Sequence, residues 1–343
     1  MKRGYTILIN TLIGTVLVSL LSVQKMEAQD LHYSLPFRTP LLLNPGFTGA
    51  AQGHYRASLA YKNQWSAIET PFKTTYAAYD MKLIGDDESD NYLGVGMALF
   101  NDKAGKTKMG LNQSNLSGAY GLRLNILHFF SGGLSLGFSQ HSAQYEGLKW
   151  DSQHDGVTYD AALPTGESAL PENYFYMDVG AGVTWTYTPL NYYSFNFGFA
   201  VSHANKAKDT YFADGTDREN LRLVLHGSSD WELNKHWSVL PELQMIKKGG
   251  AYEITGGSFV RYITGENSKY TTLKTSSSAS VGLFYRYGDA AIFALLYDYK
   301  RVMSLAISYD LNISPLKVAS SSRGGIEISL LYKGFFEQQR IKL

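Results

Sequence analysis

Apolar and polar residues alternate along much of the chain, with the period of two that a β-strand gives to its two faces. In the segment 174–187 the odd-numbered residues are mostly large and apolar, namely Phe175, Met177, Val179, Ala181, Val183, Trp185 and Tyr187. Their even-numbered neighbours are mostly polar or small, such as Asp178 and Thr184. The segments 54–65 and 326–333 repeat the pattern. Each such segment predicts a strand with one apolar face and one polar face.

Fourteen strands are predicted on this basis, at 53–65, 72–83, 92–100, 114–124, 133–145, 174–187, 192–203, 220–231, 236–246, 251–263, 276–287, 290–299, 302–312 and 325–334. An even number places both ends of the series on one side of a membrane, as in bacterial single-chain barrels. The long connections 146–173, 204–219 and 313–324 then share the outer side. Most other connections, such as 232–235, are short periplasmic turns, although 264–275 is longer than expected there.

Aromatic residues gather near the ends of these strands, at Trp65, Tyr92, Trp185, Tyr187, Tyr192, Tyr193, Trp231, Trp237, Tyr285, Tyr287, Tyr297, Tyr299 and Tyr332. A soluble β-sandwich would instead fill its apolar faces mainly with Val, Ile and Leu. Aromatic girdles at two lipid–water interfaces explain the observed placement. We therefore predict an all-β fold, a transmembrane outer-membrane β-barrel of about 14 antiparallel strands with an N-terminal plug-like segment.

The first residues have the layout of a secretory signal peptide, predicted over 1–28. A basic start precedes an apolar stretch from about residue 7 to residue 23, and a polar exit ends at Ala28. The alternative is a single membrane anchor of about 17 residues, which several polar residues dilute. The remaining chain is divided into a plug segment, 29–52, the barrel, 53–334, and a periplasmic tail, 335–343. The expected location is the cell outer membrane.

Composition narrows the possible partners and chemistry. The formal net charge of +1 comes from 31 Lys and Arg against 30 Asp and Glu, so no strong field attracts nucleic acid. The chain has no cysteine, which excludes thiolate catalysis, disulfides, iron–sulfur clusters and a lipid-anchored amino terminus. We expect membrane lipid, and no nucleic acid, as a partner.

No segment has the spacing of an enzyme site, and we expect neither catalytic residues nor a cofactor nor a metal site. The eight histidines never occur at the i, i+4 spacing of a helical metal pair. The acidic segment 209–217 could hold calcium but misses the EF-hand pattern. Glycines in 94–100 and 180–182 lie within strands, where they indicate close packing more than a phosphate cradle. A barrel phospholipase with a Ser-His pair on its outer surface stays an open alternative.

Charged residues recur on the face opposite the apolar one and are predicted to point into the lumen: Arg56, Lys62, Asp80, Lys82, Arg123, Asp178, Arg286, Asp310 and Glu327, together with Glu242, Arg261 and Asp298. Inward charges must be solvated or paired. Either a water-filled pore or a lumen packed with an internal segment satisfies this requirement. The balanced signs favour pairing.

The segment before the first strand is too apolar for a free periplasmic tail. Its central residues, Leu41, Leu42, Leu43, Asn44, Pro45 and Gly46, end an apolar run in a sharp bend. We predict a plug in which the three leucines pack on the apolar inward strip of 290–299, and in which Gly46 takes a positive φ that turns the chain toward the first strand. A disordered leader is the alternative.

The sequence resembles the PorP/SprF family of type IX secretion outer-membrane proteins from the Bacteroidota. The stretches 40-PLLLNPGFTGA-50, 61-YKNQWSAIETPFKTTYAAYDMKL-83 and 309-YDLNISPLKVASSSRGGIEISLLY-332 carry the resemblance. The family commonly has Ala where this chain has Gly46, and commonly stops soon after its last strand, whereas this chain continues to residue 343.

The resemblance implies a non-enzymatic part of the secretion machinery. Its partners would be secreted cargo with a C-terminal secretion domain, such as gliding adhesins, and other components of the system, including periplasmic ring and peptidoglycan-binding proteins. Outer-membrane channels for hydrophobic small molecules of the FadL type are also similar, with fourteen strands and an N-terminal plug. The closing stretch 309–332 resembles the secretion family and has no role in a transporter.

Overall fold

The computed structural model describes residues 33–64, 71–86, 91–104, 109–143, 149–165, 173–190, 192–210, 215–264, 276–314 and 323–335. Its fourteen strands are β1 (Tyr55–Gln64), β2 (Phe72–Asp86), β3 (Asn91–Ala104), β4 (Met109–Arg123), β5 (His128–Ser142), β6 (Asn173–Leu190), β7 (Tyr193–Ser202), β8 (Arg222–Glu232), β9 (Trp237–Lys248), β10 (Ala251–Thr264), β11 (Ser277–Arg286), β12 (Ala290–Tyr299), β13 (Met303–Asn312) and β14 (Arg323–Gly334). The predicted signal peptide lies outside the described residues.

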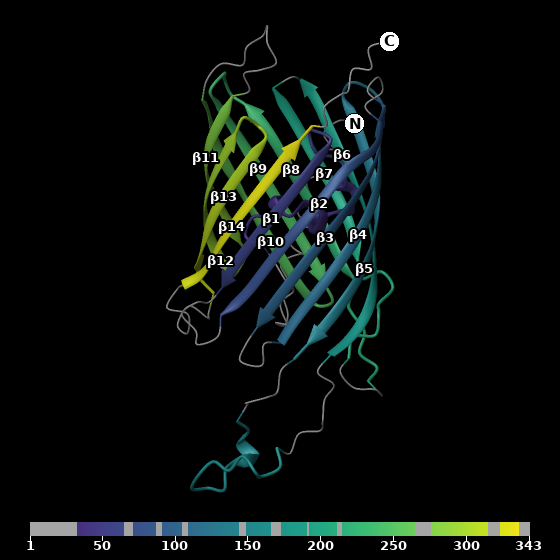
Figure 1. Ribbon diagram of the computed structural model, residues 1–343. Helices are drawn as coiled ribbons and strands as arrows, with labels where there is room; N and C mark the ends of the chain where they lie inside the picture. Colours follow the sequence, from purple (N-terminus) through teal and green to yellow (C-terminus); the bar gives the residue numbers. More distant parts are fainter. Residues whose placement is uncertain are drawn as a thin grey trace, which may run out of the picture.

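Each strand pairs antiparallel with its neighbours in the sequence, and β1 pairs with β14 to close the barrel. Tyr55 lies opposite Gly334, and Gln64 lies opposite Gly325. Figure 1 shows the closed wall and the strong tilt of its strands. Closure matters because every strand then has a partner on both sides, which leaves no sheet edge for lipid to meet.

Side chains on the two faces of the wall differ as the alternation predicts. In β13 exposed and buried residues alternate without interruption, and Leu305, Ile307 and Tyr309 point outward. Leu134, Leu283 and Leu295 are at least 60% exposed, which suits a wall bathed in hydrocarbon. The inward residues are often small, so the lumen has room for additional chain. The prediction of a fourteen-stranded outer-membrane barrel is confirmed.

Several strands are longer than the sequence predicts. The strand β4 begins at Met109, where the prediction began at 114, and β5 begins at His128, where it began at 133. The ladder hydrogen bonds with neighbouring strands continue past the apolar belt, and there the side-chain pattern no longer marks the strand. Among the described residues no helix is long and apolar enough to cross a membrane.

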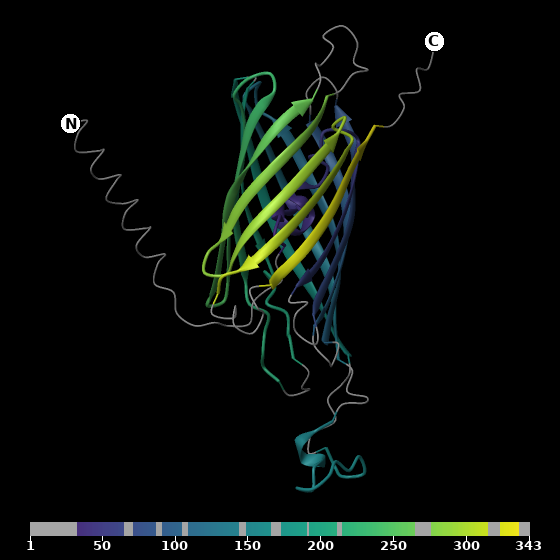
Figure 2. The ribbon, with the colours of Figure 1, turned by 90° about the vertical axis from the view of Figure 1, so that its left-hand side faces the viewer.

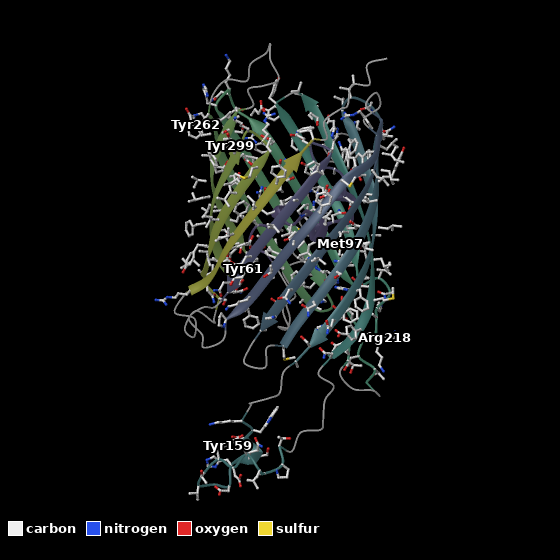
Figure 3. All side chains as sticks on the ribbon, viewed as in Figure 1. Tyr61, Met97, Tyr159, Arg218, Tyr262 and Tyr299 are labelled. Atoms are coloured by element: carbon white, nitrogen blue, oxygen red, sulfur yellow. The ribbon has the colours of Figure 1, made fainter. Side chains whose placement is uncertain are left out.

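The two ends of the barrel differ. The residues 149–165, which include the short helical turn η3 (Asp151–Gln153), project from the lower end in Figure 1. Figure 3 places Tyr159 and Arg218 at this end, and Tyr262 and Tyr299 at the opposite end. The strand β14 also finishes at the upper end. The parity of the strands predicts that the lower end is extracellular and the upper end periplasmic.

Cysteine labelling tests this orientation. Val157 is 89% exposed in the projecting segment, and Lys235 is exposed in the turn between β8 and β9. We expect Val157→Cys to react with a membrane-impermeant maleimide on intact cells, and Lys235→Cys to react only after the outer membrane is permeabilised. The native chain has no thiol and so gives no background. The reverse labelling pattern would invert the assigned orientation.

Candidate functional site

The residues 33–52 lie inside the barrel and form what we call the plug (Figure 2). They fold into three short helical turns, η1 (Pro36–Arg38), α2 (Pro40–Leu43) and η2 (Pro45–Phe47). Each turn starts at a proline, which suits the first helical position because its missing N–H would have no intrahelical partner there. The close spacing of these prolines keeps every turn short, since each one interrupts the hydrogen bonding of a longer helix.

Leucines of the plug pack on three different sectors of the wall. Leu41 belongs to a cluster with residues of β1, β2 and β3, including Tyr76 and Phe100. Leu43 packs with Ala200, Val224 and Ile246 on β7, β8 and β9. Leu42 is partly buried against the cluster of Leu41.

The strip on β12 is occupied by a leucine that the sequence analysis did not single out. Leu35, only 1% exposed, packs with Phe259, Phe284, Ile292 and Ala294. The prediction that the leucines 41–43 fill this strip is therefore wrong. Successive residues of a helical turn point about 100° apart, so three consecutive leucines cannot face one strand.

Asn44 ties the plug to the wall and is fully buried. Its Oδ1 accepts a hydrogen bond from the backbone N–H of Gly46 (2.7 Å) and so caps η2. Its Nδ2 donates to the carbonyl oxygens of Val183 on β6 (3.0 Å) and Phe199 on β7 (3.3 Å). It also lies 3.0 Å from Nε2 of His226 on β8. One amide side chain therefore joins the plug to three strands.

Gly46 does not reverse the chain, which corrects the second expectation for this segment. It lies within η2, and the positive φ values are at Gly49 in the plug (+73°) and at Gly53 just after it (+117°). Pro45 and the Asn44 cap hold a right-handed turn over Gly46, so the reversal toward β1 occurs only afterwards. A Cβ at Gly46 would lie 3.0 Å from Oδ1 of Asn44, so an alanine there would require a small shift of that side chain.

Glycines of the wall form a socket for the turn at 44–49. A Cβ on Gly133 of β5 would collide with the backbone of Pro45, and one on Gly182 of β6 would collide with the side chain of Asn44. A Cβ on Gly94 of β3 would lie 2.5 Å from the carbonyl oxygen of Thr48. These three glycines let the plug backbone approach the strands directly. The sequence predicts close packing at the glycines of 94–100 and 180–182. In the structure, Gly94 and Gly182 pack closely against the plug.

Predicted lumen charges bind the plug backbone. Arg56 and Asp80 form a buried bidentate pair, with distances of 2.8 Å and 3.0 Å. The second oxygen of Asp80 accepts the N–H of Gly49 (2.8 Å), and Arg56 donates to the carbonyl oxygen of Phe47 (2.9 Å). Glu327 accepts the N–H of Ser34 (2.6 Å). These groups therefore stabilise the plug as well as one another.

A second group of predicted charges links strands across the barrel seam. Asp310 on β13 lies 2.6 Å from Nη2 of Arg286 on β11 and 3.4 Å from Nζ of Lys62 on β1. Arg286 also binds Asp289 (2.7 Å). Asp310, Lys62 and Arg286 are almost completely buried, so this pairing offsets part of their desolvation.

Three further predicted charges lie toward the two ends of the barrel. Asp178 meets Nδ1 of His203 (3.0 Å) at the extracellular end, where Lys248 also binds Glu219 (2.6 Å). Burial raises the pKa of Glu219 above its usual range, and its contact with Asp209 adds to this effect. Lys82 and Arg123 instead lie at the other end, against the rings of Tyr92 and Phe129.

Three functional residues escaped the sequence analysis: Leu35, Arg38 and His226. Arg38 is a lone cation in an otherwise apolar stretch, and this isolation is a signal that could have found it. His226 and Gly133 occupy inward positions of predicted strands, but their partners are far away in the sequence. In the described part of the chain, no group of three His, Asp or Glu side chains is arranged to hold a metal ion.

The contacts of the plug reach around the whole wall. Its hydrogen bonds, close approaches and side-chain clusters involve residues from all fourteen strands. Thr48, for example, binds Ser117 on β4, and Arg38 binds Ser304 on β13. The plug thus occupies the middle of the lumen, and among the described residues a cavity lies on each side of it.

Comparisons with known proteins give one family and several similar structures. The family model described as type IX secretion system membrane protein PorP/SprF matches residues 25–332. No curated protein matches the chain. Similar solved structures include the toluene transporter TbuX of Ralstonia pickettii, with 9% identity over 85% of this chain and 92% of that chain and a TM-score of 0.48. The CymD monoaromatic hydrocarbon channel has 9% identity over 91% and 96%, with a TM-score of 0.49.

The glycine socket leads to a test with a matched control. Gly133→Ala places a methyl group against Pro45, whereas Gly132→Ala, on the outer face of the same strand, meets nothing within 4 Å. Overpacking of this kind costs about 1–3 kcal/mol, which corresponds to a roughly 5- to 150-fold larger population with the plug displaced. We expect more frequent and longer open currents in planar bilayers for Gly133→Ala only. Equal currents from both variants would show that the socket does not hold the plug.

Proposed function

The chain belongs to the PorP/SprF family of type IX secretion system membrane proteins, and from this premise we propose that it is a non-enzymatic component of that system. It lies in the outer membrane as a closed barrel. Its proposed role is to support the export or the surface attachment of proteins that carry a C-terminal secretion domain, such as gliding adhesins of the Bacteroidota.

The filled lumen is the observation that carries this proposal. A simple porin needs a water-filled passage, whereas here the plug has side-chain or backbone contacts with every part of the wall. Buried ion pairs and backbone hydrogen bonds fix it in place. A barrel closed in this way is suited to hold other proteins at the membrane, because its wall and both of its ends present a rigid scaffold.

The two ends of the barrel support partners on both sides of the membrane. The extracellular end carries the projecting segment 149–165, which is ordered by its own hydrogen bonds, including Gln153 to Leu163 and a bridge between His154 and Tyr159. We propose that cargo meets the protein at this end. Periplasmic ring and peptidoglycan-binding components would meet the opposite end, where several turns are short.

The second candidate is a FadL-like channel for hydrophobic small molecules. Its support is the apolar strip of Leu35 and β12 within the lumen. The cavities on either side of the plug argue against it, because polar side chains form most of their lining. Examples are Asp178 and Lys248 in one cavity and Arg38 and Asp298 in the other. An apolar ligand bound there would remove water from these polar groups without replacing their hydrogen bonds, which costs free energy.

Deletion of the gene in its native host distinguishes the two functions. We expect the surface amount of one or more proteins with a C-terminal secretion domain to fall at least tenfold in surface proteomics, with no change in the uptake of labelled long-chain fatty acid. Re-expression of the parent or of Gly132→Ala should restore surface display fully. An unchanged surface proteome together with lost fatty-acid uptake would favour the channel.

A further inference from the structure

A polar cavity of about 280 Å³ opens at the periplasmic end of the barrel. Its wall comes from β8, β10, β11, β12, β13 and β14. Its floor is the plug, because Arg38 near the start of the plug and Gln52 at its end both line it. A ligand that fills this cavity would therefore lie beside both ends of the plug.

The charges that line this cavity are unevenly paired. Its cations are Arg38, Arg261, Arg301 and Lys333, and its carboxylates are Asp230, Glu232 and Asp298. Arg261 and Asp230 neutralise each other at 2.7 Å. Among the described residues, Arg301 and Lys333 have no ion-pair partner within 4.0 Å.

Arg38 is held by neutral groups. Its Nη2 donates to the carbonyl oxygen (3.0 Å) and the hydroxyl (2.8 Å) of Ser304, and its Nε lies 3.4 Å from the hydroxyl of Ser329. These bonds fix the guanidinium, and the carboxylates of Asp298, Glu242 and Glu327 act on its charge without a hydrogen bond to it. The five N–H donors of arginine leave it capacity to bind a further acceptor from the cavity.

Lys333 lies among like charges. Arg56, Arg38 and Arg301 repel its charge, and the carboxylate of Asp298 attracts it. Asp80 already neutralises Arg56. Cations gathered in a partly desolvated site repel one another, and an anion that enters among them removes this cost.

The turn between β12 and β13 adds a separate observation. Its two residues, Lys300 and Arg301, have φ values of +48° and +57°. Two-residue turns with this geometry favour Asn-Gly, since side chains of other types are strained at positive φ. Here the strained positions carry two cations. Lys300 lies against the ring of Tyr299, which Figure 3 shows at the upper end of the barrel, while Arg301 lines the cavity.

We infer that this cavity binds carboxylate side chains of an acidic segment of a periplasmic protein. Arg301 and Lys333 provide the unpaired charge, and Arg38 offers a guanidinium at the floor, where two carboxylate oxygens can be bound side by side. Phosphate shares this chemistry, so the test includes it. Only the identity of the partner, a periplasmic protein, rests on the proposed function. The binding of carboxylates can be measured on the isolated barrel.

The test uses the purified full-length protein in a non-ionic detergent and a fluorescein-labelled hexaglutamate peptide, with binding followed by fluorescence anisotropy at low salt. We expect saturable binding that weakens about tenfold or more in the double variant Arg301→Ala/Lys333→Ala. Added salt should weaken binding to the parent, because screening reduces the attraction between exposed charges.

Lys300→Ala is the matched control, since it removes the same charge from the same turn without changing the cavity lining. Its affinity for hexaglutamate should equal that of the parent. Equal affinities of the parent and the double variant would overturn the inference, as would displacement of the peptide by inorganic phosphate at equal concentration. The binding assay does not depend on secretion. Absence of peptide binding would therefore overturn this inference and leave the proposed function intact, and an unchanged surface proteome would count against the proposed function and leave peptide binding intact.

Discussion

Hydrocarbon offers no partner to a backbone N–H or C=O group, and the rest of this structure follows from that constraint. Pairing of β1 with β14 satisfies it by joining the strands into a closed wall. Closure then creates an interior that either water or protein must fill. The inward face is rich in small residues, such as Ala60, Ser131 and Ala200, and this leaves room for a segment of chain.

The plug must satisfy its own backbone groups without a long helix or a strand. Caps within the plug serve some of them, as Asn44 does for Gly46. Wall carboxylates serve others, since Glu327 accepts from Ser34 and Asp80 accepts from Gly49. The lumen charges, whose balanced signs predict pairing with one another, therefore have a second role as partners of buried backbone. This explains why carboxylates lie beside the plug with cations next to them.

The sequence predicted the barrel well because the relevant signal is local. Side chains along each strand face lipid and lumen in turn. The apolar Leu305 and the polar Ser304 therefore indicate their own faces, without any knowledge of the residues on neighbouring strands. The interior of the plug could not be predicted in this way. Asn44 contacts His226, which is 182 residues away, and Leu35 replaces Leu41 to Leu43 on β12 because helical turns set their directions. Lys82 and Arg123 lie at the mouth because they stand at or near the ends of β2 and β4, and alternation reports the face of a residue but not its depth.

The plug connects the two ends of the barrel through a short path. Leu41, Leu42 and Pro45 line the cavity on the extracellular side, and Arg38 and Gln52 line the cavity on the periplasmic side. A partner bound at one end is therefore in contact with the same segment that forms the floor at the other. If both partners bind more tightly to a particular position of the plug, the binding of one partner changes the affinity of the barrel for the other. The change is the same in both directions, because the coupling free energy between two binding sites is reciprocal.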